Sequence, residues 1–467
     1  MGTTELPKAK NNPGGLTALL LVIIVVCLVV RVGSVLNHPE TARSGLGPFG
    51  DSWAYHALGY NLAQGNGYSI TDYGAAKGSR MDPAGTHVYE PAATRAPIYP
   101  YFLSLIYRFT GLSGSVSAGQ LQETFHWVRL IQCALDTLTC LLVFCLTRLL
   151  ARGSTPAALT ASLLYALSPY HLYFSNAILT ETLATFITVL AALTTTKAII
   201  GNHTYAWALS GALWGILALC RPEYFPFGIV LAVILGAWHW RLGIPSGRVV
   251  ILAIGIVAVM SPWIIRNFNT FGHPFVSTGG LGYSLFLGTF EGSAGFTGWS
   301  DVPEEFFPDQ HERMMLVAMT EEYMQAMRRG SVDISSVDRK FLDFAVSRIV
   351  HDPFSSVLSW IRNAPRLWYQ RQTPMYRDPE PQGFFALILL GTALIGFSIS
   401  RKKCSIATAP AGMLIAFVTM LYAPLHIEPR YSVPALALVI CFSGIGIAQL
   451  IHLAANTEWR RQRSYLG

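Results

Sequence analysis

The sequence predicts an all-α polytopic membrane protein with about ten transmembrane helices. The 467-residue chain is 52% hydrophobic and only 13% charged, with a mean hydropathy of +0.41, which is too apolar for a soluble enzyme of this length. Apolar runs long enough to cross a bilayer recur along it, and short basic clusters separate many of them. The net charge of +7 therefore reflects topology, and we expect no nucleic-acid partner.

The predicted transmembrane helices follow the apolar runs. These runs lie near residues 15–36, 124–148, 156–173, 177–199, 205–220, 224–240, 248–266, 384–400, 408–424 and 432–453. The first, LTALLLVIIVVCLVVRVGSVL, lacks a clear small-residue cleavage site, so we expect a retained anchor rather than a cleaved signal peptide. Residues 96–111, with Arg108 near their end, are too short to cross, which favours a helix that lies at the interface or re-enters the membrane.

Charge asymmetry between the loops predicts the orientation. If each run crosses once, the basic clusters share one side with both termini, and the positive-inside rule makes that side cytoplasmic. The clusters comprise Lys8 and Lys10, Arg148 and Arg152, Lys197, Arg241 and Arg248, Arg401, Lys402 and Lys403, and Arg460, Arg461 and Arg463.

This topology divides the chain into five sections. We expect a disordered cytoplasmic tail (1–14), an N-terminal transmembrane module (15–266) that includes a first external loop (37–123), an external helical loop (267–383), C-terminal transmembrane helices (384–455) and a basic cytoplasmic tail (456–467). Polar chemistry is expected in the two external segments.

The stretch FGDSWAYHALGYNLAQGNGYSI gathers Asp51 with several aromatic residues just past the first apolar run. Its apolar residues recur at spacings of three and four, which predicts a short amphipathic helix along the outer surface. One interpretation of Asp51 is an N-cap that satisfies free backbone N–H groups. The other is a catalytic carboxylate, and the two are compatible, because one oxygen can cap while the other faces a cleft.

Charged side chains collect on the same predicted outer rim. Singly, an arginine at a membrane edge is more often a snorkelling anchor than a ligand. Together, arginines and acids from different helices fit an anionic ligand with a reacting hydroxyl, because guanidinium groups bind phosphate and a carboxylate can take a proton. The set comprises Asp51, Glu90, Arg95, Glu181, Arg221, Glu223, Arg266, His426, Glu428 and Arg430.

Six segments, in order, carry a family resemblance. They are GDSWAYHALGYNLAQGNGYS, TRAPIYPYFLSLIYRFTG, NAILTETLATF, LCRPEYF, SPWIIRNFNTFGHPF and HIEPRYSVPALAL. Taken together they resemble the bacterial membrane glycosyltransferases of the GT-C superfamily, and within it the protein O-mannosyltransferase and aminoarabinose-transferase group. The resemblance runs from about residue 15 to about residue 455, and no single segment decides it.

The resemblance implies transfer of a single sugar from a polyprenyl-phosphate donor to an acceptor hydroxyl at the outer face of the bacterial inner membrane. It makes Asp51 the general base, whereas Arg95, Arg266 and Arg430 hold the donor phosphate. Because phosphate leaves as a weak base, such a site needs positive charge more than a general acid, and one carboxylate suffices for attack with inversion. Thr94 stands where relatives often carry a second acid.

Further residues are expected at this site. Glu181 is the second catalytic candidate, although its place near a helix start, like that of Glu223, also fits stabilisation by the helix dipole. The candidate substrate contacts are Tyr55, Glu90, Arg221, His426, Glu428 and Tyr431.

No obligatory cofactor or metal is expected, because no dense carboxylate cluster lies near Asp51 in the sequence. The expected partners are the lipid-linked donor, membrane lipid and a glycan, lipid or protein acceptor. The seven cysteines follow no disulfide or zinc pattern. Arg129 and Asp136, within one apolar run, are expected to pair with each other.

Two other classes of function stay open. A transporter or lipid flippase should show repeated halves and polar residues near the membrane midplane. A non-catalytic envelope-assembly factor would tolerate the loss of Asp51.

Overall fold

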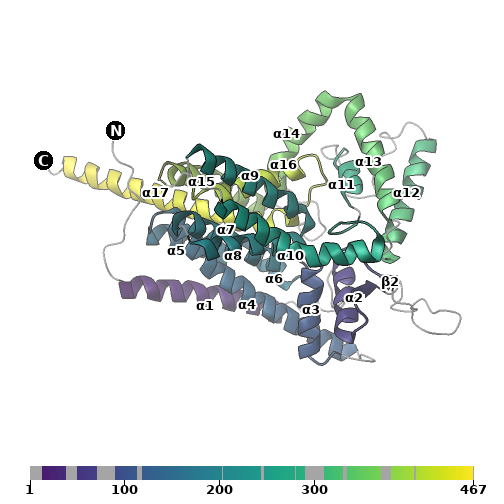
Figure 1. Ribbon diagram of the computed structural model, residues 1–467. Helices are drawn as coiled ribbons and strands as arrows, with labels where there is room; N and C mark the ends of the chain where they lie inside the picture. The colour runs from purple at the N-terminus through teal and green to yellow at the C-terminus, as the bar shows by residue number, and fades with distance from the viewer. Residues whose placement is uncertain are drawn as a thin grey trace.

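The computed structural model of the chain is a bundle of long helices with shorter helices gathered at one end (Figure 1). It describes residues 13–37, 50–70, 90–112, 118–201, 203–242, 247–278, 280–289, 310–329, 334–369, 380–403 and 406–465.

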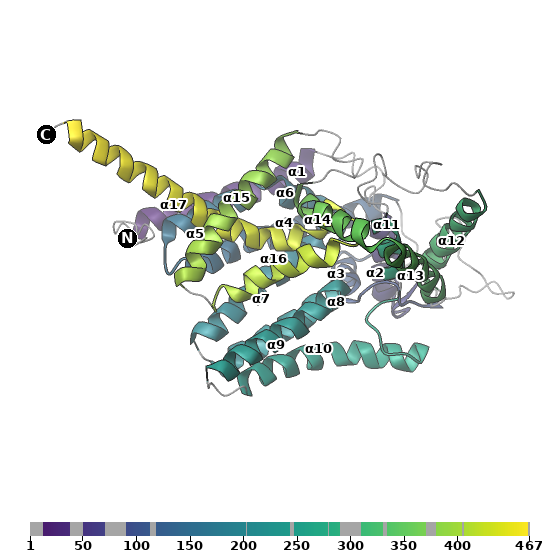
Figure 2. The ribbon, with the colours of Figure 1, turned by 90° about the horizontal axis from the view of Figure 1, so that it is seen from above.

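Within these residues, seven helices are long and apolar enough to cross a membrane, by length and composition. They are α1 (Pro13–Asn37), α4 (Ala118–Leu150), α7 (Glu181–Gly201), α9 (Phe225–Arg241), α10 (Gly247–Phe271), α15 (Glu380–Lys403) and α17 (Val433–Tyr465). Two shorter apolar helices, α8 (Thr204–Cys220) and α16 (Ala409–Tyr422), lie among them (Figure 2). The all-α polytopic class is confirmed, and the count of ten crossings stays a prediction.

The run predicted at 156–173 is not one helix. It forms α5 (Thr155–Ala166) and α6 (Pro169–Asn176), with Ser168 extended between them. Proline lacks the N–H that would continue the hydrogen-bond ladder, and its ring disfavours helical backbone in the preceding residue. The chain therefore turns at Ser168.

A buried arginine of α1 holds the end of α5. Arg31 is fully buried, and its guanidinium donates to the carbonyl oxygens of Tyr165 and Ala166. The same guanidinium forms an ion pair with Asp136 of α4, which also accepts a hydrogen bond from the Tyr165 hydroxyl at 2.5 Å. Each buried polar group thus has a partner on a neighbouring helix, which is the condition for keeping charge inside a bundle.

The predicted pair between Arg129 and Asp136 is wrong. Arg129 Nε instead donates to the carbonyl oxygen of Asn176 at 3.0 Å, while Asp136 pairs with Arg31. Two residues seven positions apart lie about 10 Å apart along a helix axis. Each of the two side chains therefore pairs with a nearer group on another helix.

The end of the bundle that carries α2, α3 and the later short helices is called here the cap end (Figure 1). Helix α2 (Gly50–Gln64) packs on α3 (Ile98–Phe109), and a Cβ on Gly59 would lie 2.8 Å from the Leu103 side chain, so only glycine permits this approach. Strands β1 (Ser69–Ile70) and β2 (Glu90–Pro91) form a two-residue antiparallel ribbon that the sequence did not predict. The ribbon leads the chain from α2 into α3.

Four more helices complete the cap end: α11 (Leu281–Gly288), α12 (Gln310–Arg329), α13 (Ile334–His351) and α14 (Pro353–Tyr369). They have a small core of their own, in which Phe286, Tyr323 and Phe341 are buried. Asp338 of α13 accepts hydrogen bonds from the backbone N–H groups of Gly280, Gly282 and Tyr283, each at 3.0 Å. This carboxylate satisfies the first turn of α11 and so fixes its position.

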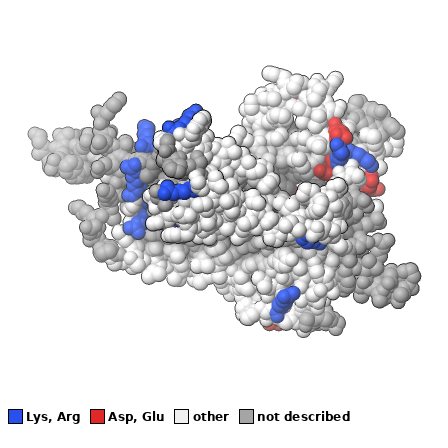
Figure 3. Space-filling view, in the orientation of Figure 1, with Lys and Arg blue, Asp and Glu red and all other residues white. Residues whose placement is uncertain are grey.

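Lysine and arginine side chains gather at the opposite end, where α1 begins and α17 ends (Figures 1 and 3). The cap end shows acidic and basic groups together (Figure 3). The chain is thus a multi-pass membrane protein with one basic end and one end of mixed charge.

Candidate active site

A cavity of about 530 Å³ lies at the cap end. Its walls come from α2, the segment before α3, the start of α7, the end of α8, the first turn of α9, α11 and the α16–α17 connection. Charged lining residues from the described part of the chain comprise three carboxylates and three guanidinium groups: Asp51, Glu181, Glu223, Arg95, Arg221 and Arg430. Segments far apart in sequence therefore bring ionic groups of both signs to one hollow.

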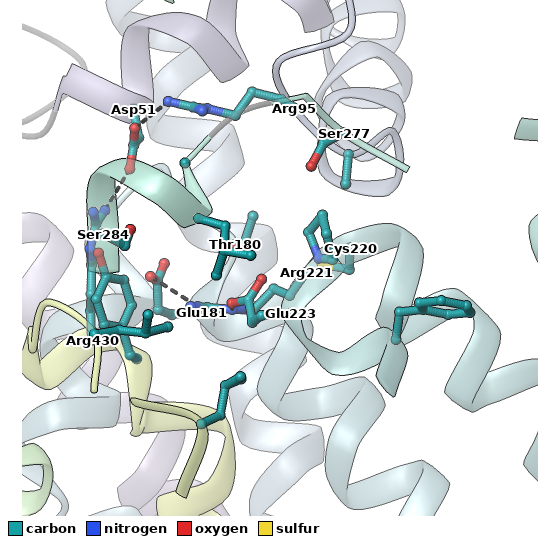
Figure 4. A pocket seen from close by; sticks show the side chains of 18 of the residues that line it. Asp51, Arg95, Thr180, Glu181, Cys220, Arg221, Glu223, Ser277, Ser284 and Arg430 are labelled. Atoms are coloured by element: carbon teal, nitrogen blue, oxygen red, sulfur yellow. Dashed lines mark hydrogen bonds and ion pairs between the residues drawn. The ribbon is translucent and has the colours of Figure 1, made fainter. Parts of the chain in front are cut away.

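Asp51 lies in the first turn of α2 and is held by two arginines (Figure 4). Arg95 Nη2 donates to Oδ1 at 2.5 Å, and Arg430 Nη1 donates to Oδ2 at 2.8 Å. The exposed fraction of the side chain is 29% for Asp51, against 18% and 14% for the arginines, so solvent and ligands still reach the carboxylate. Both oxygens are engaged by guanidinium groups, an arrangement that goes beyond a helix cap.

Local structure places both arginines. Arg95 follows β2, and the Tyr68 hydroxyl fixes this segment by donating to the carbonyl oxygens of Arg95 and Ala96 at 2.9 and 3.2 Å. Arg430 lies in the 3-10 turn η6 (Pro429–Tyr431), where the proline fixes one backbone angle just before it. Each side chain is therefore presented by a braced segment that lies outside the long helices.

The electrostatics around Asp51 favour its ionised form. Burial by itself would raise the pKa of Asp51, but the positive charges of Arg95 and Arg430 and their hydrogen bonds outweigh burial and hold the pKa well below its ordinary value. Asp51 is therefore a carboxylate at neutral pH.

Arg430 is shared with a second carboxylate. Its Nε lies 2.5 Å from Glu428 Oε2, and Glu428 Oε1 lies 3.5 Å from His426 Nε2. Burial would raise the pKa of Glu428, but Arg430 and then His426 lower it below its ordinary value. Neither Glu428 nor His426 belongs to the described lining of the cavity, so the structure places them behind Arg430, and as substrate contacts they remain predictions.

A second ionic group lies across the cavity from Asp51 (Figure 4). Arg221, at the end of α8, donates from Nη1 to Glu181 Oε1 at 3.2 Å and from Nε to Glu223 Oε1 at 2.6 Å. The Tyr422 hydroxyl donates to the same Glu223 oxygen at 3.0 Å. Glu181 and Arg221 are almost fully buried, with side-chain exposures of 3% and 6%.

Sequence reasoning missed part of this group. Glu223 stands in the predicted set of charged rim residues but not among the predicted site residues, and Tyr422 is in neither set, although both line the cavity. The only available signal was the short spacing in RPEY, where Arg221 and Glu223 flank a proline. Tyr422 lies at the end of an apolar helix and gives no sequence signal of its own.

Aromatic rings line the cavity beside the charges. Tyr431 stacks on Tyr422 with ring centroids 4.7 Å apart and an interplanar angle of 8°. The guanidinium carbons of Arg430 and Arg221 lie 5.3 and 6.0 Å from the centre of the Tyr431 ring. Tyr55 also lines the cavity, with the Arg95 guanidinium 5.8 Å from its ring. Cation–π contacts of this kind orient the arginines.

Arg266 is placed differently from the expectation. Its Nη1 donates to the carbonyl oxygen of Ala92 at 2.9 Å and its Nη2 to that of Tyr68 at 3.1 Å, and Arg266 is absent from the described cavity lining. The expected meeting of Asp51 with all three arginines is therefore corrected to a meeting with two. Arg266 braces the ribbon that presents Arg95, because a carbonyl oxygen has two lone pairs and can accept a hydrogen bond from the guanidinium group as well as from the backbone. Glu90 pairs through its backbone in β2, and its side chain lies outside the described residues.

One part of the cavity wall is apolar. Phe225 and Pro226, in the first turn of α9, face the cavity together with Leu421 and Leu425 near the end of α16. Phe225 is 37% exposed, so this wall continues to the outer surface of the bundle. The cavity thus combines a charged interior with an apolar side.

Among the described residues, no group of three or more His, Cys, Asp or Glu side chains is placed to hold a metal ion. Each lining carboxylate instead has a guanidinium neighbour. The expectation that no metal is obligatory stays a prediction.

Comparison with known proteins adds a family match over part of the chain and a fold over nearly all of it. Residues 94–265 match the dolichyl-phosphate-mannose-protein mannosyltransferase family. The oligosaccharyltransferase of Archaeoglobus fulgidus in its apo form superposes with a TM-score of 0.51 at 13% identity, over 98% of this chain and 52% of that protein. The chain has the fold of this oligosaccharyltransferase. The match covers residues 94–265, and the shared fold extends over nearly the whole chain.

Two further solved structures are similar to the chain. The same archaeal enzyme tethered to an acceptor peptide gives a TM-score of 0.50 at 14% identity, over 93% of this chain and 49% of that one. ArnT from Cupriavidus metallidurans bound to undecaprenyl phosphate gives 0.35 at 14% identity, over 96% of this chain and 80% of that one. The chain spans about half the length of the archaeal enzyme. A comparison with curated protein sequences gave no match.

Proposed function

We propose that this GT-C chain transfers a single sugar from a polyprenyl-phosphate donor to an acceptor hydroxyl at the external membrane face, with inversion and with Asp51 as the general base. The observation that carries the proposal is the Asp51 carboxylate held between Arg95 and Arg430 in the cavity wall. The matched family, named for dolichyl-phosphate-mannose, supports a lipid-phosphate sugar as the donor class.

The two arginines supply what a phosphate leaving group needs. Phosphate departs as a weak base, so positive charge at the departing oxygen stabilises the transition state more than a proton donor would. Arg95 and Arg430 together outnumber the one lining carboxylate that they contact, and a guanidinium group has further N–H donors to offer an anion.

Donor binding would also raise the pKa of Asp51, the proposed general base. In the free site, the two guanidinium groups keep the pKa of Asp51 low, which makes it a weak proton acceptor. When a phosphate shares those guanidinium groups, their hold on Asp51 weakens and its pKa rises towards the range that a general base needs. The base thus becomes effective only when the donor is bound.

The proposed reaction is one displacement. The acceptor oxygen attacks the anomeric carbon as Asp51 removes its proton. A new bond forms between that oxygen and the anomeric carbon, and the bond from this carbon to the phosphate oxygen breaks. Polyprenyl phosphate leaves with the bonding electrons, and attack from the opposite face inverts the anomeric configuration.

The apolar wall supports a lipid-linked donor. Phe225, Pro226, Leu421 and Leu425 form an apolar side of the cavity that continues to the exposed surface at Phe225, which we take to face lipid. A prenyl chain can leave by this side and stay in lipid while its phosphate reaches the arginines, because apolar surface is removed from water along the whole path. The basic end of the bundle would face the cytoplasm of a bacterial inner membrane, which puts the cavity at the external face.

The test is an Asp51→Asn variant reconstituted in proteoliposomes with a radiolabelled polyprenyl-phosphate hexose and envelope acceptor. We expect transfer to fall by about a hundredfold to ten-thousandfold, which is the usual contribution of a general base, while binding of the donor is retained. Glu322→Gln, at an exposed ion pair of α12, is the matched control and should transfer normally. Undiminished transfer by the Asp51 variant would refute the assignment.

A further inference from the structure

One oxygen of Glu181 is buried without a hydrogen-bond partner in the described structure. Glu181 is 2% exposed, and its Oε1 accepts from Arg221, but its Oε2 has no donor among the described residues. Native proteins rarely leave a buried carboxylate oxygen unsatisfied, because removing it from water without replacing its hydrogen bonds is unfavourable. Glu181 lines the cavity, so a molecule bound there can supply the missing donor.

The balance of charge is more negative around Arg221 than around Arg430, which Asp51 and Glu428 share. Arg221 stands between two carboxylates, Glu181 and Glu223, so this group carries a net negative charge when all three are ionised. Asp51 stands between two guanidinium groups. The two groups lie across one cavity (Figure 4). A bound molecule is therefore expected to direct its anionic part to the Asp51 side and an uncharged, hydrogen-donating part to the Glu181 side.

We propose that Glu181, oriented by Arg221, is a specificity-determining residue that accepts a hydrogen bond from a hydroxyl of the transferred sugar, and that this sugar is neutral. The inference rests on the proposed function, which supplies the donor. In this inference Glu181 binds the sugar, whereas the sequence predicts it as a second catalytic residue. A sugar with a carboxylate, such as a uronate, would meet Glu181 and Glu223 and be repelled, since like charges brought together are strongly disfavoured.

The experiment measures binding to the full chain in nanodiscs. Three probes are used: polyprenyl phosphate alone, a polyprenyl-phosphate hexose and a polyprenyl-phosphate hexuronate. The wild-type chain should bind the hexose carrier about 10- to 100-fold more tightly than the hexuronate carrier, the range expected when a charged hydrogen bond is gained or lost. Glu181→Gln should reduce this preference to about twofold, because the side chain keeps its shape and loses its charge. Binding of polyprenyl phosphate alone should not change.

Two further variants guard against a folding defect. Glu181→Asp keeps the charge but withdraws the oxygens by one methylene, so it should still reject the hexuronate while binding the hexose carrier more weakly. Glu322→Gln makes the same chemical change beside a lysine on the exposed surface of α12, and should leave all three affinities unchanged. If Glu181→Gln does not yield folded protein, the Glu181→Asp result decides.

The outcomes separate the two proposals. If the wild type fails to bind polyprenyl phosphate, the proposed function fails and the inference falls with it. If polyprenyl phosphate binds but the hexose preference is absent, or survives in Glu181→Gln, only the inference is overturned. An equal loss of all three probes in Glu181→Gln would also overturn it, because that pattern indicates a general structural role.

Discussion

Arg430 Nη1 donates a 2.8 Å hydrogen bond to Asp51 Oδ2, although 379 residues separate them in the chain. The contact joins the start of α2 to the turn before the last helix, and it closes one side of the cavity. It also determines the acid–base behaviour of Asp51, because the guanidinium group favours the ionised carboxylate.

The pH dependence of kcat/KM should report this pair. The pH dependence of kcat/KM reflects the pKa values of the free enzyme, in which the pKa of Asp51 is lowered. We therefore expect kcat/KM to stay constant from neutral pH down to below the ordinary carboxyl pKa of about 3.9. Arg95→Gln removes one guanidinium group, so the acid limb should move to higher pH. Profiles of kcat/KM against pH for both proteins measure this shift. An unmoved limb would mean that Arg95 does not act on the base.

The same lowered pKa has a consequence for stability. A carboxyl whose pKa is lower when folded stabilises the fold at pH values above its unfolded pKa, and this contribution is lost as the pH falls through the folded value. The melting temperature should therefore fall less steeply with acid in Asp51→Asn than in the wild type. Thermal unfolding in detergent from pH 7 down to pH 2 measures the difference, which should develop below the ordinary carboxyl pKa of about 3.9. Parallel curves would contradict it.

Arg430 and Arg266 should differ in donor binding. Arg430→Gln should weaken binding of polyprenyl phosphate about 10- to 100-fold, because charged hydrogen bonds contribute about 1.5–3 kcal/mol. Arg266→Lys is the control, since Arg266 bonds to the carbonyl oxygens of Ala92 and Tyr68 and lies off the described lining. It should bind polyprenyl phosphate within about twofold of the wild type. An equal loss of affinity for polyprenyl phosphate in both variants would indicate that Arg266 also binds the phosphate.

The buried Arg31–Asp136 pair should matter for stability. Asp136→Asn leaves the fully buried guanidinium of Arg31 without its counter-charge, and breaking such a pair typically destabilises by about 3–5 kcal/mol. The double change Arg31→Met with Asp136→Leu should be milder, because it removes both charges. Melting temperatures of the purified variants compare them. If the double variant were less stable than Asp136→Asn, the pair would stabilise the fold by more than the mutual neutralisation of its two charges.

Two glycines of α15 should respond differently to substitution. A Cβ on Gly396 would lie 1.8 Å from the backbone oxygen of Phe442 in α17, whereas a Cβ on Gly391 meets nothing within 4 Å. Gly396→Ala should therefore push α15 from α17 and lower the melting temperature. Gly391→Ala should be neutral or stabilising by up to about 1 kcal/mol, because alanine is the better helix former. Equal effects of the two changes would contradict the close packing.

The apolar runs were enough to predict the helices. Nine of the ten predicted runs coincide with single helices, and residues 96–111 form a short helix at the cap end, because long runs of apolar residues stabilise helices in lipid wherever they occur. The exception at Ser168 has a local cause in the following proline that was visible in the sequence and was not used.

Part of the site was also predictable. Asp51, Glu181, Arg95, Arg430, Tyr55, Arg221 and Tyr431 were singled out from their motifs, and all line the cavity. Their roles in transfer stay predictions. The motifs locate polar residues at helix ends, where an ionisable group needs a reason in a membrane protein.

The sequence by itself determined which segments are helical and which charged residues stand at their ends, because both depend on local composition. Only the tertiary structure decided how these charges pair: Asp51 with Arg95 and Arg430, Glu181 with Arg221, and Arg266 with the ribbon carbonyls. The reason is that an ion pair depends on a separation of a few ångströms between side chains from different helices. Spacing along the chain contains no information about that separation.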